Sequence, residues 1–118
     1  MRGGDEPPFF YIMRIVVNNI PWEVSLTSDT YKLQRDDGSL TLGVTDTNTN
    51  TVSIWHGLNP SMMKKVLLHE LSHVFIHSYG YSISIDEEEF ICAFIDTYAE
   101  GIVSLVLELL SSYEKKFS

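Results

Sequence analysis

The pentapeptide His69-Glu70-Leu71-Ser72-His73 constrains this chain more than any other feature of its sequence. Its two histidines are four residues apart, and an α-helix places residues with this spacing on one face, one turn apart. On a helix, both imidazoles can reach one metal ion, with Glu70 beside them. The pentapeptide therefore predicts a helix with a metal-binding face. The plainer interpretation is an ordinary amphipathic helix with surface histidines.

The residues around this pentapeptide predict a helix over residues 60–79. Asn59 is a suitable N-cap, and Pro60 suits the first helical position, where its missing N–H costs nothing. Gly80 favours a helix end because glycine readily adopts the left-handed conformation. Apolar residues recur between these ends at helical spacing, namely Leu67, Leu71, Val74 and Phe75.

A second long helix is predicted downstream. Ser84 and Glu87 have the spacing of a capping box, which marks a helix N-terminus. An apolar stripe follows, and we expect it to face inward. Its members are Ile91, Ile95, Tyr98, Ile102, Leu105 and Leu109.

A catalytic zinc ion needs a third protein ligand and an open fourth position. The metzincin spacing is excluded, because Ile76 and Tyr79 stand where that layout requires glycine and histidine. A glutamate from the second helix remains. Glu88 lies along the apolar stripe and is the expected ligand, while Glu89, on the polar side, is the alternative. The plainer interpretation is that these acids are solvated and match the dipole of the first helical turn. It is preferred for Glu89, whereas the ligand role is preferred for Glu88.

These segments resemble the ImmA/IrrE-like metallopeptidases, especially their small phage and mobile-element members, called minigluzincins. The likeness rests on the HELSH helix and on the run EEFICAFI over residues 88–95, with looser similarity over residues 13–100. It implies one zinc ion per chain, held by His69, His73 and Glu88, with Glu70 as the catalytic base. Related enzymes often carry Asp or Asn four residues after the ligand glutamate. Here Cys92 takes that place and is a weak hydrogen-bond partner, so another group is expected to orient the histidines.

The expected function is that of a zinc metalloendopeptidase in which Glu70 takes a proton from a zinc-bound water. Three residues are candidate oxyanion donors, namely His77, Tyr79 and Tyr81, although each also has a plainer role at a helix end or in packing. The alternative is a non-catalytic or regulatory zinc-binding domain of a phage-like mobile element that acts by binding a partner. A metal-free interaction module is a third interpretation.

The rest of the sequence predicts an α+β fold, in which a small, mostly antiparallel sheet packs against the two long helices. Strands are expected over residues 14–17 and 22–27, joined by a turn at Asn18-Asn19, and a short helix over 28–34. A hairpin is expected from strands 39–46 and 51–55. Its exposed edge is a candidate dock for an extended peptide or protein substrate.

Composition bounds the remaining possibilities. With 118 residues, a single domain over 13–112 is expected, after an N-terminal extension over 1–12 and before a polar tail over 113–118. A net charge of −8 argues against nucleic-acid binding. A single cysteine and the acids within the second helix favour a cytoplasmic protein without a membrane span. The substrate and the oligomeric state are left open.

Overall fold

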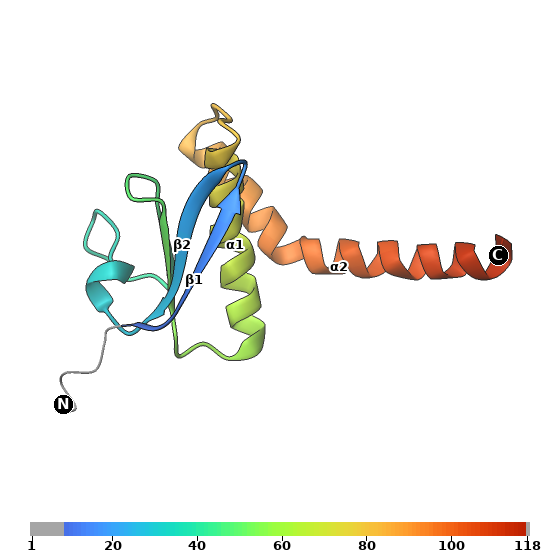
Figure 1. The fold of residues 1–118 in the computed structure, drawn as a ribbon, viewed down its shortest axis with the longest axis horizontal. Helices are drawn as coiled ribbons and strands as arrows, with labels where there is room; N and C mark the ends of the chain where they lie inside the picture. Colours follow the sequence, from blue (N-terminus) through green and yellow to red (C-terminus); the bar gives the residue numbers. More distant parts are fainter. Residues whose placement is uncertain (1–8, 118) are drawn as a thin grey trace.

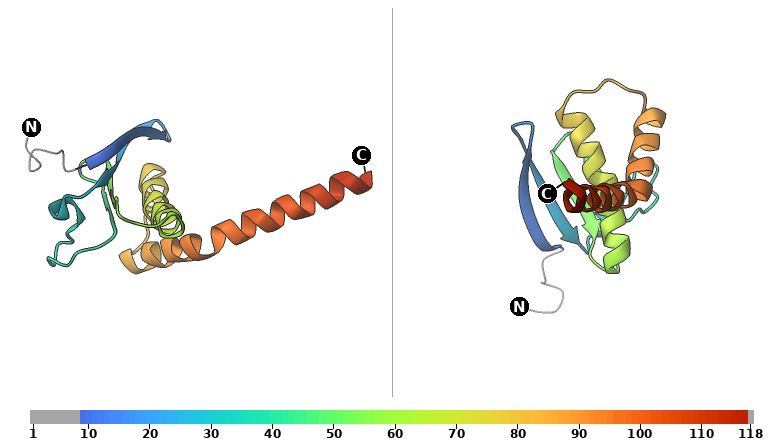
Figure 2. Two further views of the ribbon diagram at one scale, coloured as in Figure 1. Left: turned by 90° about the horizontal axis from the view of Figure 1, so that it is seen from below. Right: turned by 90° about the vertical axis from the view of Figure 1, so that its right-hand side faces the viewer.

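The computed structural model describes residues 9–117 and has an α+β fold, as the sequence predicts. The strands are β1 (Phe9–Val17), β2 (Ile20–Thr27), β3 (Gly43–Asp46) and β4 (Thr51–Trp55). The helices are α1 (Pro60–Ser78), α2 (Ile85–Phe117) and a short 3-10 helix, η2 (Thr30–Leu33). Figures 1 and 2 show that α1 covers one face of the sheet and that α2 lies against α1.

The sheet is mixed and has the strand order β1-β2-β4-β3. β1 pairs with β2 and β3 with β4 in antiparallel fashion, whereas β2 and β4 are parallel. The predicted turn between the first two strands is confirmed. Asn18 and Asn19 have φ values of 50° and 64° there, the left-handed backbone that tight hairpins require.

The third strand is shorter than the predicted strand over residues 39–46, in which Leu40, Leu42 and Val44 alternate with polar residues. It begins at Gly43, and the preceding segment forms no regular strand: it makes an isolated bridge between Gln34 and Leu40, and the Leu42 carbonyl accepts one hydrogen bond of 2.9 Å from the Trp55 amide of β4. Leu40 is 61% exposed and Leu42 is 44% exposed. Alternation reports which side chains can share a face, but the position of the neighbouring strand decides which residues pair.

The hydrophobic core lies between the sheet and α1. Trp22 of β2, Val52 and Ile54 of β4, and Val66 and Val74 of α1 are buried in one cluster. The Trp22 indole also donates a hydrogen bond of 2.8 Å to the Ser78 hydroxyl. This core fixes the position of α1 over β3 and β4.

Both predicted ends of α1 and the predicted start of α2 are confirmed. The Asn59 side chain accepts a hydrogen bond from the Met62 amide at 2.8 Å, and Gly80 has a φ of 71°. Ser84 and Glu87 form the reciprocal bonds of a capping box, with distances of 3.2 and 3.1 Å. The two helices are therefore connected by a short, well-defined loop.

The predicted orientation of α2 is wrong for most of its length. Cys92 is its one buried residue, whereas most of the expected inward stripe is exposed, including Tyr98 at 55% and Leu105 at 59%. The side of α2 that faces α1 is the side that carries Glu88 and Asp96, because these acids contact the histidines of α1.

α2 also continues to Phe117, through most of the segment expected to be a polar tail. It is long and apolar enough to cross a membrane, judged by length and composition alone, with a mean hydropathy of 1.7 over 18 residues. At the other end of the chain, β1 begins at Phe9, before the expected start of the domain at residue 13. The first eight residues of the expected extension lie outside the described part of the chain.

Candidate metal centre

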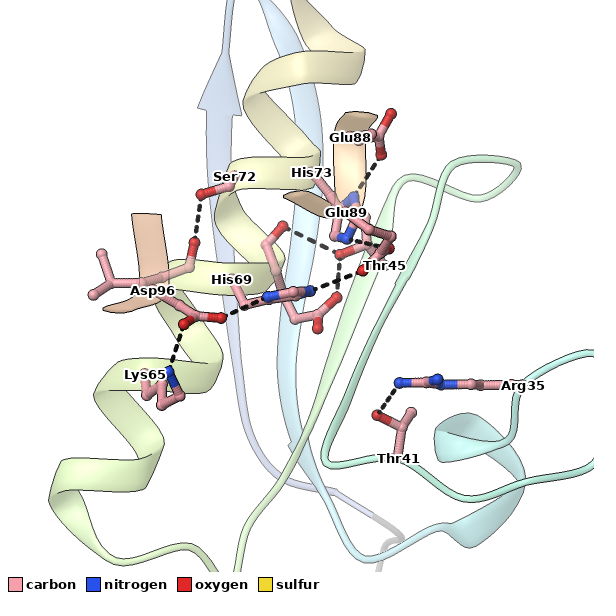
Figure 3. Close-up of polar contacts among 12 residues, drawn as sticks. Arg35, Thr41, Thr45, Lys65, His69, Ser72, His73, Glu88, Glu89 and Asp96 are labelled. Carbon is pink, nitrogen blue, oxygen red and sulfur yellow. Dashed lines mark hydrogen bonds and ion pairs between the residues drawn. The ribbon is translucent and has the colours of Figure 1, made fainter. Parts of the chain in front are cut away.

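The two histidines of the pentapeptide lie side by side on α1 and face the first turns of α2. The ring centroids of His69 and His73 are 5.2 Å apart, and both side chains are mostly shielded from solvent. Figure 3 shows three acids of α2, Glu88, Glu89 and Asp96, gathered around the two rings. These five residues are called the histidine–carboxylate cluster below.

One nitrogen of each ring is held by a carboxylate of α2. His69 Nδ1 lies 2.7 Å from Asp96 Oδ2, and His73 Nδ1 lies 2.5 Å from Glu88 Oε2. Because an ionised carboxylate only accepts hydrogen bonds, each Nδ1 must carry the proton. The opposite nitrogen, Nε2, of a neutral ring then presents a lone pair.

Both Nε2 atoms face the third carboxylate, that of Glu89. Its two oxygens lie 3.4 Å from His69 Nε2 and 3.1 Å from His73 Nε2. The three ligand atoms of His69, His73 and Glu89 all lie within 4.8 Å of one another, so the group can hold a metal ion.

This arrangement can accommodate a cation. With neutral rings, two nitrogen lone pairs and a carboxylate would face one another with no proton between them, which is unfavourable in a partly buried site. Additional protons on the rings or a bound metal ion would each relieve the repulsion. The distances suit a metal, because bonds of about 2.0–2.1 Å at tetrahedral angles place ligand atoms roughly 3.3 Å apart.

Glu88, the ligand expected from the sequence, lies at Nδ1 of His73, and Glu89 has the position shared by both rings. A histidine that binds a metal through one ring nitrogen usually donates a hydrogen bond from the other ring nitrogen to a carboxylate, and Glu88 has that position. The sequence alternative, Glu89, thus has the better position for the third ligand.

Asp96 is tied to α1 by two side chains. Lys65 Nζ lies 2.5 Å from Asp96 Oδ1, while the other oxygen of Asp96 accepts from His69. Burial raises the pKa of Asp96, but hydrogen bonds from Lys65 and then His69 outweigh it and hold that pKa below its ordinary value. Asp96 is therefore ionised at neutral pH and keeps His69 in one tautomer.

The glutamate of the pentapeptide, Glu70, is buried between α1 and β3. Its Oε1 accepts a hydrogen bond of 2.8 Å from the Thr45 hydroxyl of β3. β3 can approach so closely because Gly43 has no side chain. A Cβ there would lie 2.8 Å from Val66 Cγ1 and 2.9 Å from Glu70 Cγ.

A groove of about 750 Å³ opens beside the cluster. His69, Glu70, His73, Glu88 and Glu89 line one side of it, and residues from the η2–β3 loop and β3 line the other. Among the described residues that line this groove, Arg35 is the only Lys or Arg. In Figure 3 the Arg35 guanidinium donates a hydrogen bond of 3.3 Å to the Thr41 hydroxyl, which lies on the same wall of the groove.

Cys92 of α2 is fully buried. Burial first, and then the charges of nearby carboxylates, Glu89 foremost, raise the pKa of Cys92 to about 12. The thiol is therefore protonated at neutral pH and packs as a small apolar group. The sequence prediction that another group orients the histidines in place of Cys92 agrees with the positions of Asp96 and Glu88.

The three candidate oxyanion donors do not line the groove. The ring of His77 packs edge-on against Trp22, with centroids 5.8 Å apart. Tyr79 stacks on Phe75, and Tyr81 is 70% exposed.

Sequence reasoning missed Asp96, Thr45 and Arg35. Asp96 lies seven residues after Glu89, two helical turns along the same side, which is a spacing that could have drawn attention to it. Thr45 and Arg35 come from other elements, so no local pattern links them to the histidines. Comparisons with protein-family models, curated proteins and solved structures find no match to this chain.

Proposed function

We propose that this protein is a zinc-dependent endopeptidase whose metal ligands are His69, His73 and Glu89. The observation that carries the proposal is the set of three ligand atoms, two Nε2 and one carboxylate oxygen, that converge within 4.8 Å. Two histidines and one glutamate are the ligands of a well-known class of catalytic zinc sites, which keep a fourth position open. The resemblance of the two helices to ImmA/IrrE-like peptidases agrees with this proposal.

Glu70 is the proposed general base. When bound, zinc would supply an acidified water and polarise the scissile carbonyl. The Glu70 carboxylate, held by Thr45, takes one proton from the attacking water and passes it to the leaving amine as the C–N bond breaks. Thr45 therefore positions the base.

The groove and the free edge of β3 are the proposed substrate site. β3 lies at the edge of the sheet, and Thr45 on this strand touches Glu70. An extended peptide that pairs with this edge would pass in front of the cluster. Arg35, from the opposite wall, is the proposed donor to a substrate carbonyl, a role in which the sequence placed His77, Tyr79 or Tyr81.

Metal content tests the site. We expect about one zinc per chain in protein purified without a metal-binding tag, lost in Glu89→Gln and retained, with weaker affinity, in Glu88→Gln. Elemental analysis after dialysis measures it. Loss in Glu88→Gln with retention in Glu89→Gln would restore the ligand set expected from the sequence. No zinc in the wild type, even after zinc is added, would refute the metal site.

Peptide cleavage tests the chemistry. Glu70→Gln should retain zinc yet cleave peptides about 10²- to 10⁴-fold more slowly, because it cannot accept the proton. Mass spectrometry of an unfolded protein such as casein, incubated with each variant, measures the cleavage. Equal cleavage by wild type and Glu70→Gln would exclude the mechanism. No cleavage by a zinc-loaded wild type would favour the non-catalytic, partner-binding alternative.

A further inference from the structure

The second half of α2 projects away from the rest of the molecule, as Figures 1 and 2 show. From Glu100 to Phe117 every residue is exposed. α2 contains an 18-residue stretch that is apolar enough to cross a membrane, yet only 6% of this stretch is buried. The core helix of a soluble protein can be equally apolar but is covered by its own domain, which α2 is not.

The projecting half of α2 carries apolar side chains around more than half of its circumference. Each residue turns an α-helix by about 100°, so Leu105 and Leu107 lie about 200° apart. The side chains that fall between these two leucines are also large and apolar, namely Ile102, Val103, Val106, Leu109 and Leu110. All of these side chains are between 48% and 68% exposed. They are called the apolar arc below.

The width of the apolar arc indicates what kind of partner covers it. A helix that packs on one neighbouring element buries a stripe of roughly 100°, which would leave the rest of the arc in water. Lipid tails surround a helix and cover the whole arc. The polar strip that remains is narrow and is formed by Ser104, Glu108 and Ser111.

The acids within α2 favoured a protein without a membrane span, but two of them lie at the base of the projecting half. Asp96 and Glu100 bind lysines of α1, with contacts of 2.5 and 3.0 Å, and so belong to the globular part. Beyond Glu100, the one acid before Glu114 is Glu108. A single carboxyl group can enter apolar surroundings in its neutral form.

Side chains suited to a membrane–water interface flank the apolar arc. Tyr98 precedes the arc, and Tyr113 follows it, with Lys115 and Lys116 close behind. Tyr113 also packs on Phe117, with ring centroids 4.8 Å apart. Tyrosine rings are enriched at the level of the lipid headgroups, and lysine side chains reach the same level with their charged ends.

We propose that the projecting half of α2, from Gly101 onward, inserts into a lipid bilayer and anchors this protein to a membrane. The contacts of α2 with α1 through Glu88, Asp96 and Glu100 come before the inserted part. Insertion therefore leaves the histidine–carboxylate cluster in place, outside the lipid. The proposal does not depend on a bound metal or on peptide cleavage.

Flotation of the full chain with phosphatidylcholine vesicles on a density gradient tests this proposal. The wild type should float with the vesicles. Leu105→Asp and Leu107→Asp, at the two edges of the apolar arc, should each lower the floating fraction about 10-fold or more, because a charge is costly in lipid. Tyr31→Asp is the matched control: it places the same charge on η2, at a side chain that is 82% exposed, and should float like the wild type.

Circular dichroism must show that the variants are folded. If one of them is not, Leu109→Asp replaces Leu105→Asp and Val103→Asp replaces Leu107→Asp, since each lies near the same edge of the arc. A wild type that does not float would overturn the proposal, as would equal losses in Tyr31→Asp. Loss of flotation in Leu105→Asp alone would also overturn it, because only one side of the helix would then be covered, as a protein partner covers it.

Discussion

Asp96 shows how a single side chain can organise the candidate metal site. Its carboxylate joins Lys65 and His69 of α1 to α2, and it holds the proton of His69 on Nδ1. Glu88 does the same for His73. Both rings therefore aim their free nitrogens at Glu89. Ring orientations that the protein itself holds lower the cost of organising a site when a metal binds.

Asp96→Asn should weaken zinc binding about 10- to 100-fold, because the amide is a poorer acceptor and no longer fixes the tautomer of His69. Competition with a chromophoric chelator measures the affinity. Glu100→Gln is the matched control: Glu100 also binds an α1 lysine, Lys64, at 3.0 Å, but no contact with the histidines is found for it. Equal losses in the two variants would mean that Asp96 acts only by joining the helices.

The close packing of β3 against α1 requires that residue 43 have no side chain. Gly43 lets the strand approach Val66 and Glu70, and this approach brings the Thr45 hydroxyl to the Glu70 carboxylate. The strand thus shapes both the core and the wall of the groove. A side chain at position 43 would separate two elements that form the site together.

Gly43→Ala should destabilise the protein by about 1–3 kcal/mol, because the new Cβ would overlap the β-branched Val66 in a packed core. Gly101→Ala is the opposite control: a Cβ there meets nothing, and replacing glycine in a helix should stabilise by about 0.5–1 kcal/mol. Urea unfolding of both variants measures the two effects. A Gly43→Ala protein as stable as wild type would contradict the close approach.

The molecule as a whole is a small globular unit with one protruding helix. Its radius of gyration is 17.2 Å, against about 13.5 Å for a compact domain of this length. α2 is anchored mainly through α1, and Cys92 is its one buried residue. A metal ion held by both helices would therefore be a principal link between them.

Metal removal should consequently lower the melting temperature. At a zinc concentration 100-fold above the Kd, binding adds about 2.7 kcal/mol, or roughly 10 °C for a chain of this size. Calorimetry with EDTA and with added zinc measures the shift, and His73→Ala should show none. A wild type with the same melting temperature in both conditions would have no structural metal.

The features of the fold that depend on residues close together in the sequence were predictable. Asn59 and Ser84 cap the helices because their side chains accept hydrogen bonds from nearby backbone amides. The turn at Asn18-Asn19 and the helix end at Gly80 form because asparagine and glycine tolerate a positive φ. The histidine pair is likewise local, because helical geometry alone places His69 beside His73. The parallel pairing of β2 with β4 is not local, since it joins segments separated by η2 and β3.

The sequence by itself determined the two helices, both ends of α1, the start of α2, and the face of α1 that carries His69, Glu70 and His73, since these depend on spacing and capping within a few residues. Tertiary structure decided which side of α2 meets that face. The apolar stripe of α2 predicted one side, but α2 lies with Glu88 and Asp96 against the histidines. It also decided that Glu89 faces both Nε2 atoms, because neighbouring residues on a helix point in different directions, and only docking selects between them.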